Sequence, residues 1–305
     1  MTIHPKRSQS WSYTPTGERR GYIDPHALSE LWFHTGTVCN LACPFCLEGS
    51  KPGDDRLGRM TLAEVRPLID EAVALGVEQL SFTGGEPFVI RDMIAILAYA
   101  AERRPCLVLT NGTLPLHRRM DQLRALADAA NPIRFRVSLD YPDRALHDAG
   151  RGEGSFDQAL EGLAMLHGAG FGVSVARQMK AGEDEPAIRA GYAALFRARG
   201  LPEDLTLVPF PDFLTPDALP QVPQVTTACM TTYQDDESRR DFMCAFSKMV
   251  IKKGGRMRVY ACTLVDDDEE YDLGGTLAES MDKRVSMKHH RCYSCFAFGS
   301  SCSEL

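Results

Sequence analysis

Three cysteines stand close together in the segment TGTVCNLACPFCLEGS, residues 35–50. Cys39, Cys43 and Cys46 follow the spacing C-x3-C-x2-C. Since a structural zinc site normally closes with four ligands, three thiolates imply either a fourth ligand, such as His34, or a metal centre that keeps one position open. A 4Fe–4S cluster held by three thiolates is such a centre, because its fourth iron remains free to bind a ligand. The loop therefore predicts metal chemistry, and a Cys3His zinc site is the alternative.

A second loop that could take part in the chemistry of a site is SFTGGEP, residues 81–87, at the end of an apolar run. Gly84 and Gly85 allow the backbone to approach a ligand closely. The carboxylate or the backbone of Glu86 could bind an ammonium group, and Pro87 suits the start of a helix. Taken alone this is an ordinary loop between a strand and a helix, but beside the cysteine loop it indicates a second part of the same site.

The segments that must position these loops alternate between strand-like and helix-like patterns, which is typical of βα units around a parallel sheet. We expect strands at residues 30–36, 77–85, 106–112, 133–140, 170–177 and 205–210. We expect helices at residues 61–75, 91–104, 117–130, 155–169 and 185–199. Six units are too few for an eight-fold barrel. The prediction is an α/β fold built as a partial (β/α)6 TIM-like barrel, with an open doubly wound sheet as the alternative.

These motifs, in this order, resemble the radical S-adenosylmethionine (SAM) superfamily over about residues 30–210. The C-x3-C-x-aromatic-C loop of the family matches Cys39, Cys43, Phe45 and Cys46, and its GGE motif matches residues 84–86. The resemblance implies a 4Fe–4S cluster whose open iron binds the amino and carboxylate groups of SAM. It also implies an external one-electron donor, such as flavodoxin or ferredoxin. Cleavage of the sulfonium bond would leave a 5′-deoxyadenosyl radical that abstracts a substrate hydrogen atom.

The resemblance extends to weaker positions near the ends of later strands. Phe45 would lie near the adenine, and Thr110, Asn111 and Ser138 would contact other portions of SAM. Arg151 resembles an arginine that meets the SAM carboxylate. Each position also has an ordinary interpretation, because Asn-Gly forms turns, serine caps helices and a lone arginine is usually on the surface.

The remainder of the chain divides into segments of different composition. We expect an N-terminal extension at residues 1–29, the barrel at 30–210, a linker at 211–225 and a small cysteine-rich α+β domain at 226–305. The segment 209–225 contains five prolines, which cannot continue a helix or a central strand. The last segment lacks long periodic runs, so metal ligation is expected to stabilise it.

A second group of thiolates lies in this last segment: Cys244, Cys262, Cys292 and Cys295. Four thiolates suit either a tetrahedral zinc ion or a fully ligated 4Fe–4S cluster. Downstream of a radical SAM barrel they resemble Twitch and SPASM domains, which implies one auxiliary 4Fe–4S cluster. Cys302 is an alternative metal ligand in this set.

The cysteines outside these two groups have less specific positions. Cys229 and Cys302 together are too few to hold a second auxiliary cluster unless another group contributes. Cys106 lies inside a predicted strand and is expected to be a small buried hydrophobic residue.

Overall composition narrows the function classes. The chain has 305 residues, 44% hydrophobic and 25% charged, with a formal net charge of −7. It has no basic stripe for nucleic acid, no signal peptide and no apolar run of about 18 residues that could span a membrane. We therefore expect a cytoplasmic protein, whose ten cysteines serve metal ligation or catalysis and not disulfides.

The expected activity is oxidation of a small molecule, namely a sugar, an aminocyclitol or an amino acid. Only residues 1–29 precede the first predicted strand, so no further peptide-recognition domain is expected there. The alternative is a maturase acting on a ribosomal peptide or protein side chain. A non-catalytic zinc or iron–sulfur binding module is the remote alternative.

Overall fold

The computed structural model describes residues 8–180, 182–210, 220–299 and 303. Six parallel neighbouring strands follow the predicted alternation: β2 (Glu30–His34), β3 (Gln79–Thr83), β4 (Cys106–Thr110), β5 (Ile133–Ser138), β6 (Gly172–Gln178) and β7 (Leu207–Phe210). Within β2, Leu31 and Phe33 pack in the core between sheet and helices, whereas Trp32 packs in a second apolar cluster. This alternation follows from the two-residue period of a strand.

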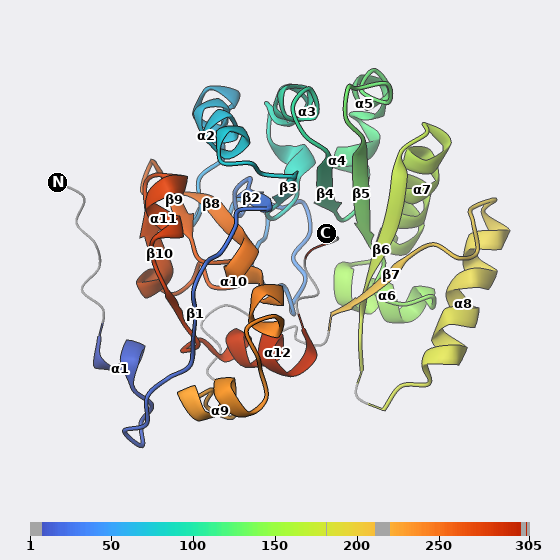
Figure 1. The fold of residues 1–305 in the computed structure, drawn as a ribbon. Coiled ribbons are helices and arrows are strands. Elements are labelled where there is room, and N and C mark those ends of the chain that lie inside the picture. The colour runs from blue at the N-terminus through green and yellow to red at the C-terminus, as the bar shows by residue number, and fades with distance from the viewer. Residues whose placement is uncertain (1–7, 181, 211–219, 300–302, 304–305) are drawn as a thin grey trace.

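Helices cover the outer face of the curved sheet (Figure 1). They are α2 (Leu62–Ala74), α3 (Met93–Ala101), α4 (Leu114–His117), α5 (Met120–Arg124), α7 (Ser155–Gly168) and α8 (Glu185–Ala198). A further helix, α6 (Arg144–Arg151), packs against α7 beyond the ends of the strands. Thr61 and Glu64 form a capping box at the start of α2. The helix predicted at 117–130 is broken, since α4 and α5 are short and separate, and α6 was not predicted from the pattern.

The C-terminal segment extends the same sheet. Strands β8 (Ser247–Lys253), β9 (Arg256–Tyr260) and β10 (Asp272–Gly274) complete the order β10-β9-β8-β2-β3-β4-β5-β6-β7. β8 runs parallel to β2, and β8 and β9 form an antiparallel pair. The fold is therefore mixed α/β with a largely parallel, partial TIM-like sheet. Among the described residues β7 and β10 are the two edges, so the sheet is not closed into a barrel.

Short elements surround the C-terminal strands. These are α9 (Thr227–Thr232), α10 (Met243–Phe246), α11 (Leu277–Met281), α12 (His290–Phe298) and two 3-10 turns at Ser238–Asp241 and Glu269–Tyr271. A further 3-10 turn, Pro87–Val89, follows β3. The predicted boundary at residue 226 stays a prediction, but the nine-stranded sheet crosses it. Of the predicted linker, residues 211–219 lie outside the described residues, and residues 220–225 contain no helix or strand.

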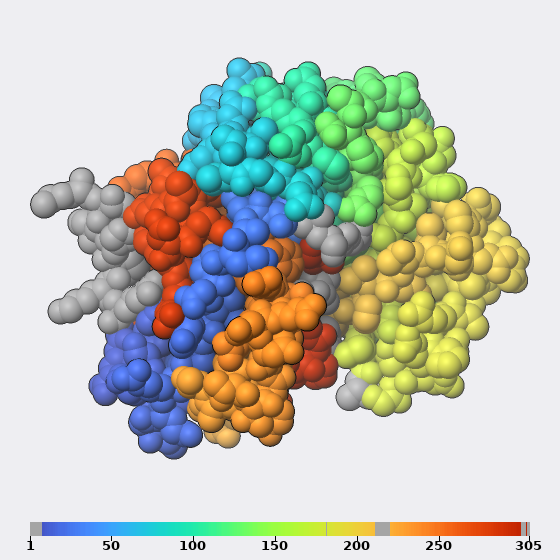
Figure 2. Space-filling model, viewed as in Figure 1, coloured from blue at the N-terminus to red at the C-terminus, as the bar shows by residue number. Residues whose placement is uncertain are grey.

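The N-terminal extension lies along the C-terminal segment. It contains α1 (Gln9–Ser12) and β1 (Tyr22–Ile23), and β1 pairs with β11 (Val285–Ser286). The Gly21 N–H donates to the Val225 carbonyl at 2.9 Å, and the Met287 N–H donates to the Gly21 carbonyl at 2.9 Å. Figure 2 shows these blue and orange segments side by side on one face. Among the described residues no helix has the length and apolar character needed to cross a membrane.

Candidate active site

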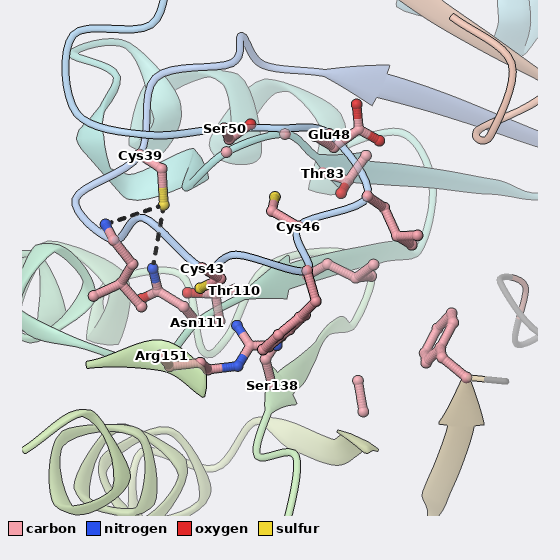
Figure 3. Close-up of a pocket in the computed structure, with 18 of the residues that line it drawn as sticks. Cys39, Cys43, Cys46, Glu48, Ser50, Thr83, Thr110, Asn111, Ser138 and Arg151 are labelled. Atoms are coloured by element: carbon pink, nitrogen blue, oxygen red, sulfur yellow. Dashed lines mark hydrogen bonds between the residues drawn. The ribbon is translucent and has the colours of Figure 1, made fainter. Parts of the chain in front are cut away.

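A cavity opens at the carboxyl ends of the parallel strands, and the predicted cysteine loop forms one of its walls (Figure 3). Its lining includes Cys39, Cys43 and Cys46, so the three expected ligands lie around one cavity. Loops at this edge of a parallel sheet are where such folds carry their chemistry.

Because Gly84 and Gly85 have no side chains, the cysteine loop can pack directly against their backbone. The Gly85 N–H donates to the Gly36 carbonyl at 2.9 Å, and the Glu86 N–H donates to the Val38 carbonyl at 3.1 Å. A Cβ atom on Gly85 would lie 2.3 Å from the Val38 carbonyl oxygen, which is too close for any side chain. Gly84 has φ +144°, a conformation that favours glycine. Both glycines also line the cavity.

The three thiols occupy surroundings that suit a bound cationic centre. The Leu41 N–H donates to Cys39 Sγ at 3.4 Å, and Asn111 Nδ2 lies 3.8 Å from the same sulfur. Burial, together with the charges of Glu86, Cys43 and Cys46, raises the pKa of Cys39 to about 12. Because three thiolates in one buried site repel one another, their deprotonated forms need a positive partner. The donor set therefore fits the 4Fe–4S cluster expected from the spacing.

His34 does not contribute to this donor set. It is fully buried, and its Nδ1 accepts a hydrogen bond from the Gly36 N–H at 3.3 Å. That bond leaves the ring proton on Nε2, which lies 3.0 Å from Glu48 Oε2. Both nitrogens of His34 thus have partners inside the protein, and the Cys3His alternative loses its fourth ligand.

Glu86 joins the ends of two strands. Its carboxylate is fully buried and accepts hydrogen bonds from the Thr110 hydroxyl at 2.9 Å and the Asn111 N–H at 2.8 Å. Burial raises its pKa to about 7, against the effect of these hydrogen bonds. The described lining of the cavity includes Thr110 and Asn111 but not Glu86. The predicted ammonium contact of Glu86 stays a prediction.

The remaining predicted SAM contacts, Phe45, Ser138 and Arg151, all line the cavity. Arg151 Nε and Nη2 donate to the two oxygens of Asp140 at 2.6 and 2.9 Å, and its guanidinium carbon lies 5.6 Å from the Phe45 ring centroid. Burial lowers the pKa of Arg151, but the charge and hydrogen bonds of Asp140, together with the charges of Cys43 and Cys46, raise it, and the net shift is upward. Asp140 is a site residue that the sequence reasoning missed. Its position two residues after the strand that ends at Ser138 was the available signal.

Residues from the C-terminal segment complete the cavity. Thr263 and Leu264, directly after Cys262, line it together with apolar side chains from three other strands, Trp32, Leu109 and Phe210. The sequence reasoning did not predict these residues, because nothing local indicates that β8 lies beside β2.

The second group of cysteines also gathers in space. Cys244 precedes β8 and Cys262 follows β9, so the antiparallel pairing brings them to one end of the hairpin. Cys292 and Cys295 both lie on α12. All four lie in or against the second apolar cluster.

The surroundings of these four cysteines also suit thiolate ligation. Burial, followed by the charges of Cys292 and Cys295, raises the pKa of Cys244, and burial raises the pKa of Cys292 to about 11. Lys248 is fully buried beside them, and its Nζ donates to the Cys244 carbonyl at 2.8 Å.

The remaining cysteines lie outside the two groups. Cys302 lies outside the described residues. Cys229 lies on α9, 3.3 Å from the Thr226 hydroxyl, and Cys106 is fully buried in the core. Among the described residues, no group of three or more His, Cys, Asp or Glu side chains is arranged around a single metal ion.

Comparison with known proteins identifies the N-terminal part. Residues 33–182 match the model of the Radical SAM superfamily. The chain is 34% identical over 167 residues to the mycofactocin maturase MftC of Mycolicibacterium smegmatis, a match of 52% of this chain and 41% of that protein. It is 34% identical over 135 residues to the AdoMet-dependent heme synthase of Nitratidesulfovibrio vulgaris, a match of 44% of this chain and 35% of that protein.

Solved structures show the same fold. The match to Streptococcus suis SuiB bound to S-adenosylmethionine has a TM-score of 0.60 at 14% identity, over 81% of this chain and 63% of that chain. SuiB bound to its precursor peptide SuiA also matches with a TM-score of 0.60, at 13% identity, over 84% of this chain and 64% of that chain.

The curated relatives match this chain over less than half of their own length. The region shared with the family model nevertheless contains the cysteine loop and the GGE motif. Members of this superfamily are enzymes that bind a 4Fe–4S cluster and SAM, which agrees with the three thiols in the cavity. Residues 33–182 of this chain are therefore a domain of the radical SAM superfamily.

Proposed function

We propose that this chain cleaves SAM reductively and uses the resulting 5′-deoxyadenosyl radical to abstract a hydrogen atom, as an oxidoreductase. The observation that carries the proposal is the gathering of Cys39, Cys43 and Cys46 in one cavity at the carboxyl ends of the strands. When bound there, a 4Fe–4S cluster supplies the electron for cleavage of the sulfonium bond.

In this proposal, residues of the chain bind SAM and orient it for the reaction. The cysteine loop is fixed to the end of β3 by the Gly85 and Glu86 backbone hydrogen bonds. Phe45 offers an aromatic face for the adenine, and Ser138 offers a hydroxyl at the end of β5. Arg151, oriented by Asp140, places a positive charge near the SAM carboxylate. Such fixed positions lower the entropy lost when reactants are aligned.

The apolar part of the cavity wall points to the chemistry of the substrate. Trp32, Leu109, Ala176, Phe210 and Leu264 present apolar surface to the cavity. A sugar or aminocyclitol placed against this wall would leave hydroxyl groups without partners, which costs about 1–3 kcal/mol for each buried group. We infer that the reacting carbon belongs to an apolar amino-acid side chain.

That side chain can belong to a free amino acid or to a peptide, and two similarities support the peptide. One curated relative is named a maturase, and SuiB, which shares the fold, has been solved with a precursor peptide. We also infer that Cys244, Cys262, Cys292 and Cys295 hold an auxiliary 4Fe–4S cluster. Since all four of its irons would carry thiolates, accepting an electron from the substrate radical suits it better than binding substrate.

The test of SAM cleavage uses anaerobically reconstituted protein reduced with dithionite. We expect wild type to form 5′-deoxyadenosine, and the Cys39→Ala/Cys43→Ala/Cys46→Ala variant to form none. Cys106→Ala is the matched control, because that cysteine is buried in the core and away from the cavity. Equal rates for the triple variant and wild type would show that the assignment is wrong.

The test of substrate class measures whether added compounds stimulate 5′-deoxyadenosine formation. We expect the N-acetyl amides of leucine and phenylalanine to stimulate it and inositol to have no effect. Stimulation by inositol alone would contradict the apolar wall as the substrate side of the cavity.

A further inference from the structure

Arg291 makes one contact to each of the two cysteine-containing regions. It lies on α12 directly before Cys292 and is 3% exposed. Its Nη1 donates to the Leu264 carbonyl at 2.8 Å, and its Nη2 donates to the Leu47 carbonyl at 3.0 Å. Leu47 follows Cys46 in the sequence, and Leu264 is two residues after Cys262. One guanidinium thus joins residues next to cysteines of both sites.

A second arginine, Arg56, joins the same two segments of the chain. Arg56 Nη1 donates to Asp266 at 2.8 Å, and its Nη2 donates to the Glu48 carbonyl at 3.1 Å. Asp266 is 2% exposed and belongs to the segment after β9, whereas Glu48 belongs to the cysteine loop. The loop after Cys46 is therefore held to the segment after Cys262 at two consecutive residues.

The geometry of Arg291 makes this connection stiff. A guanidinium is planar and presents its N–H groups in fixed directions, so two carbonyls bound at once are held at a set separation. A lysine ammonium has one nitrogen on a flexible stem and cannot fix two acceptors in this way. Arg291 therefore links the position of α12, which carries Cys292 and Cys295, to that of the Leu47 carbonyl.

We propose that Arg291 is a positioning residue that couples the two sites: filling of the C-terminal cysteine site fixes α12, and Arg291 thereby orders the loop that carries Cys46. The inference rests on the proposed function in taking both cysteine groups as metal sites. The test of this coupling measures backbone order and needs neither SAM nor turnover. The coupling can therefore be tested even if the proposed SAM cleavage is wrong.

The first experiment compares hydrogen exchange in reconstituted full-length wild type, Arg291→Lys and the control Arg189→Lys. Arg189 is an exposed residue on α8 that pairs with Glu185. We expect the amides of residues 46–50 to exchange about tenfold faster in Arg291→Lys and unchanged in the control. Circular dichroism and iron content confirm that each variant is folded and loaded. Wild-type exchange rates in a folded, loaded Arg291→Lys protein would overturn the proposal.

The second experiment leaves Arg291 intact, so it also decides the case in which Arg291→Lys does not fold. In the Cys39→Ala/Cys43→Ala/Cys46→Ala background only the C-terminal site can be filled. We expect filling it with iron and sulfide to slow exchange at residues 46–50 relative to the protein without iron. Exchange at these residues that does not respond to filling would refute the coupling.

Discussion

Trp32 of β2 lies opposite Met249 of β8 in a parallel pair. This pairing places the C-terminal hairpin beside the strand that leads into the cysteine loop. Thr263 and Leu264, which follow the hairpin, line the cavity. The C-terminal segment is consequently part of the active-site wall, and changes in it are expected to affect the SAM site.

The iron content separates the two metal sites. Three thiolates at one site and four at the other predict about eight irons and eight sulfides per chain after reconstitution. The Cys39→Ala/Cys43→Ala/Cys46→Ala variant should keep about half of each, because the C-terminal ligands remain. Elemental analysis measures both quantities. One zinc per chain together with about four irons would instead make the C-terminal site a structural zinc site.

Substitution of Gly85 is expected to disrupt the cysteine loop. The new Cβ would meet the Val38 carbonyl oxygen at 2.3 Å, so the backbone bonds that hold the loop must break. We expect Gly85→Ala to lose most of the three-cysteine cluster while keeping the C-terminal site. Gly168→Ala is the control, because an added Cβ there meets nothing within 4 Å. Equal iron content in the two variants would contradict this account of the GGE motif.

Lys248 is expected to tune the auxiliary cluster. Its buried ammonium interacts electrostatically with Cys244 and Cys262, although burial lowers its pKa to about 8. A nearby positive charge favours the reduced, more negative state of a cluster. We expect Lys248→Met to shift the midpoint potential of the auxiliary cluster to more negative values, measured by a spectroscopic redox titration. Lys252→Met, on the same strand but paired with Glu64, should leave that potential unchanged.

His147 is expected to make stability depend on pH. It is fully buried, accepts the Asp140 N–H at 3.1 Å, and burial lowers its pKa to about 4. The unfolded state takes up the proton near pH 6.5, so stability is present above about 6.5 and is lost as the pH falls toward 4. Between about pH 7.5 and about pH 5, wild type should lose about 2 kcal/mol more than His147→Gln in urea unfolding. Parallel losses in the two proteins would assign the pH dependence to other groups.

The sequence by itself determined the parallel strands and the loops that follow them. The cysteine spacing, the GGE motif and the residues after later strands could be placed together because the carboxyl ends of parallel strands share one edge. Thus Cys39, Thr110 and Ser138 were expected in one site, and the structure places them around one cavity. These signals are local: each depends on a few neighbouring residues and on a strand whose pattern is visible in the sequence.

Only the tertiary structure decided which distant segments meet. The pairing of β8 with β2, the Glu86 carboxylate at Thr110, and the contact between Arg291 and Leu47 join residues that no local pattern relates. Arg291 and Leu47 are 244 positions apart, so their contact follows from packing of the whole sheet. Strand neighbours chosen over such separations depend on the sum of burial and hydrogen bonding in the complete fold, which a single segment does not contain.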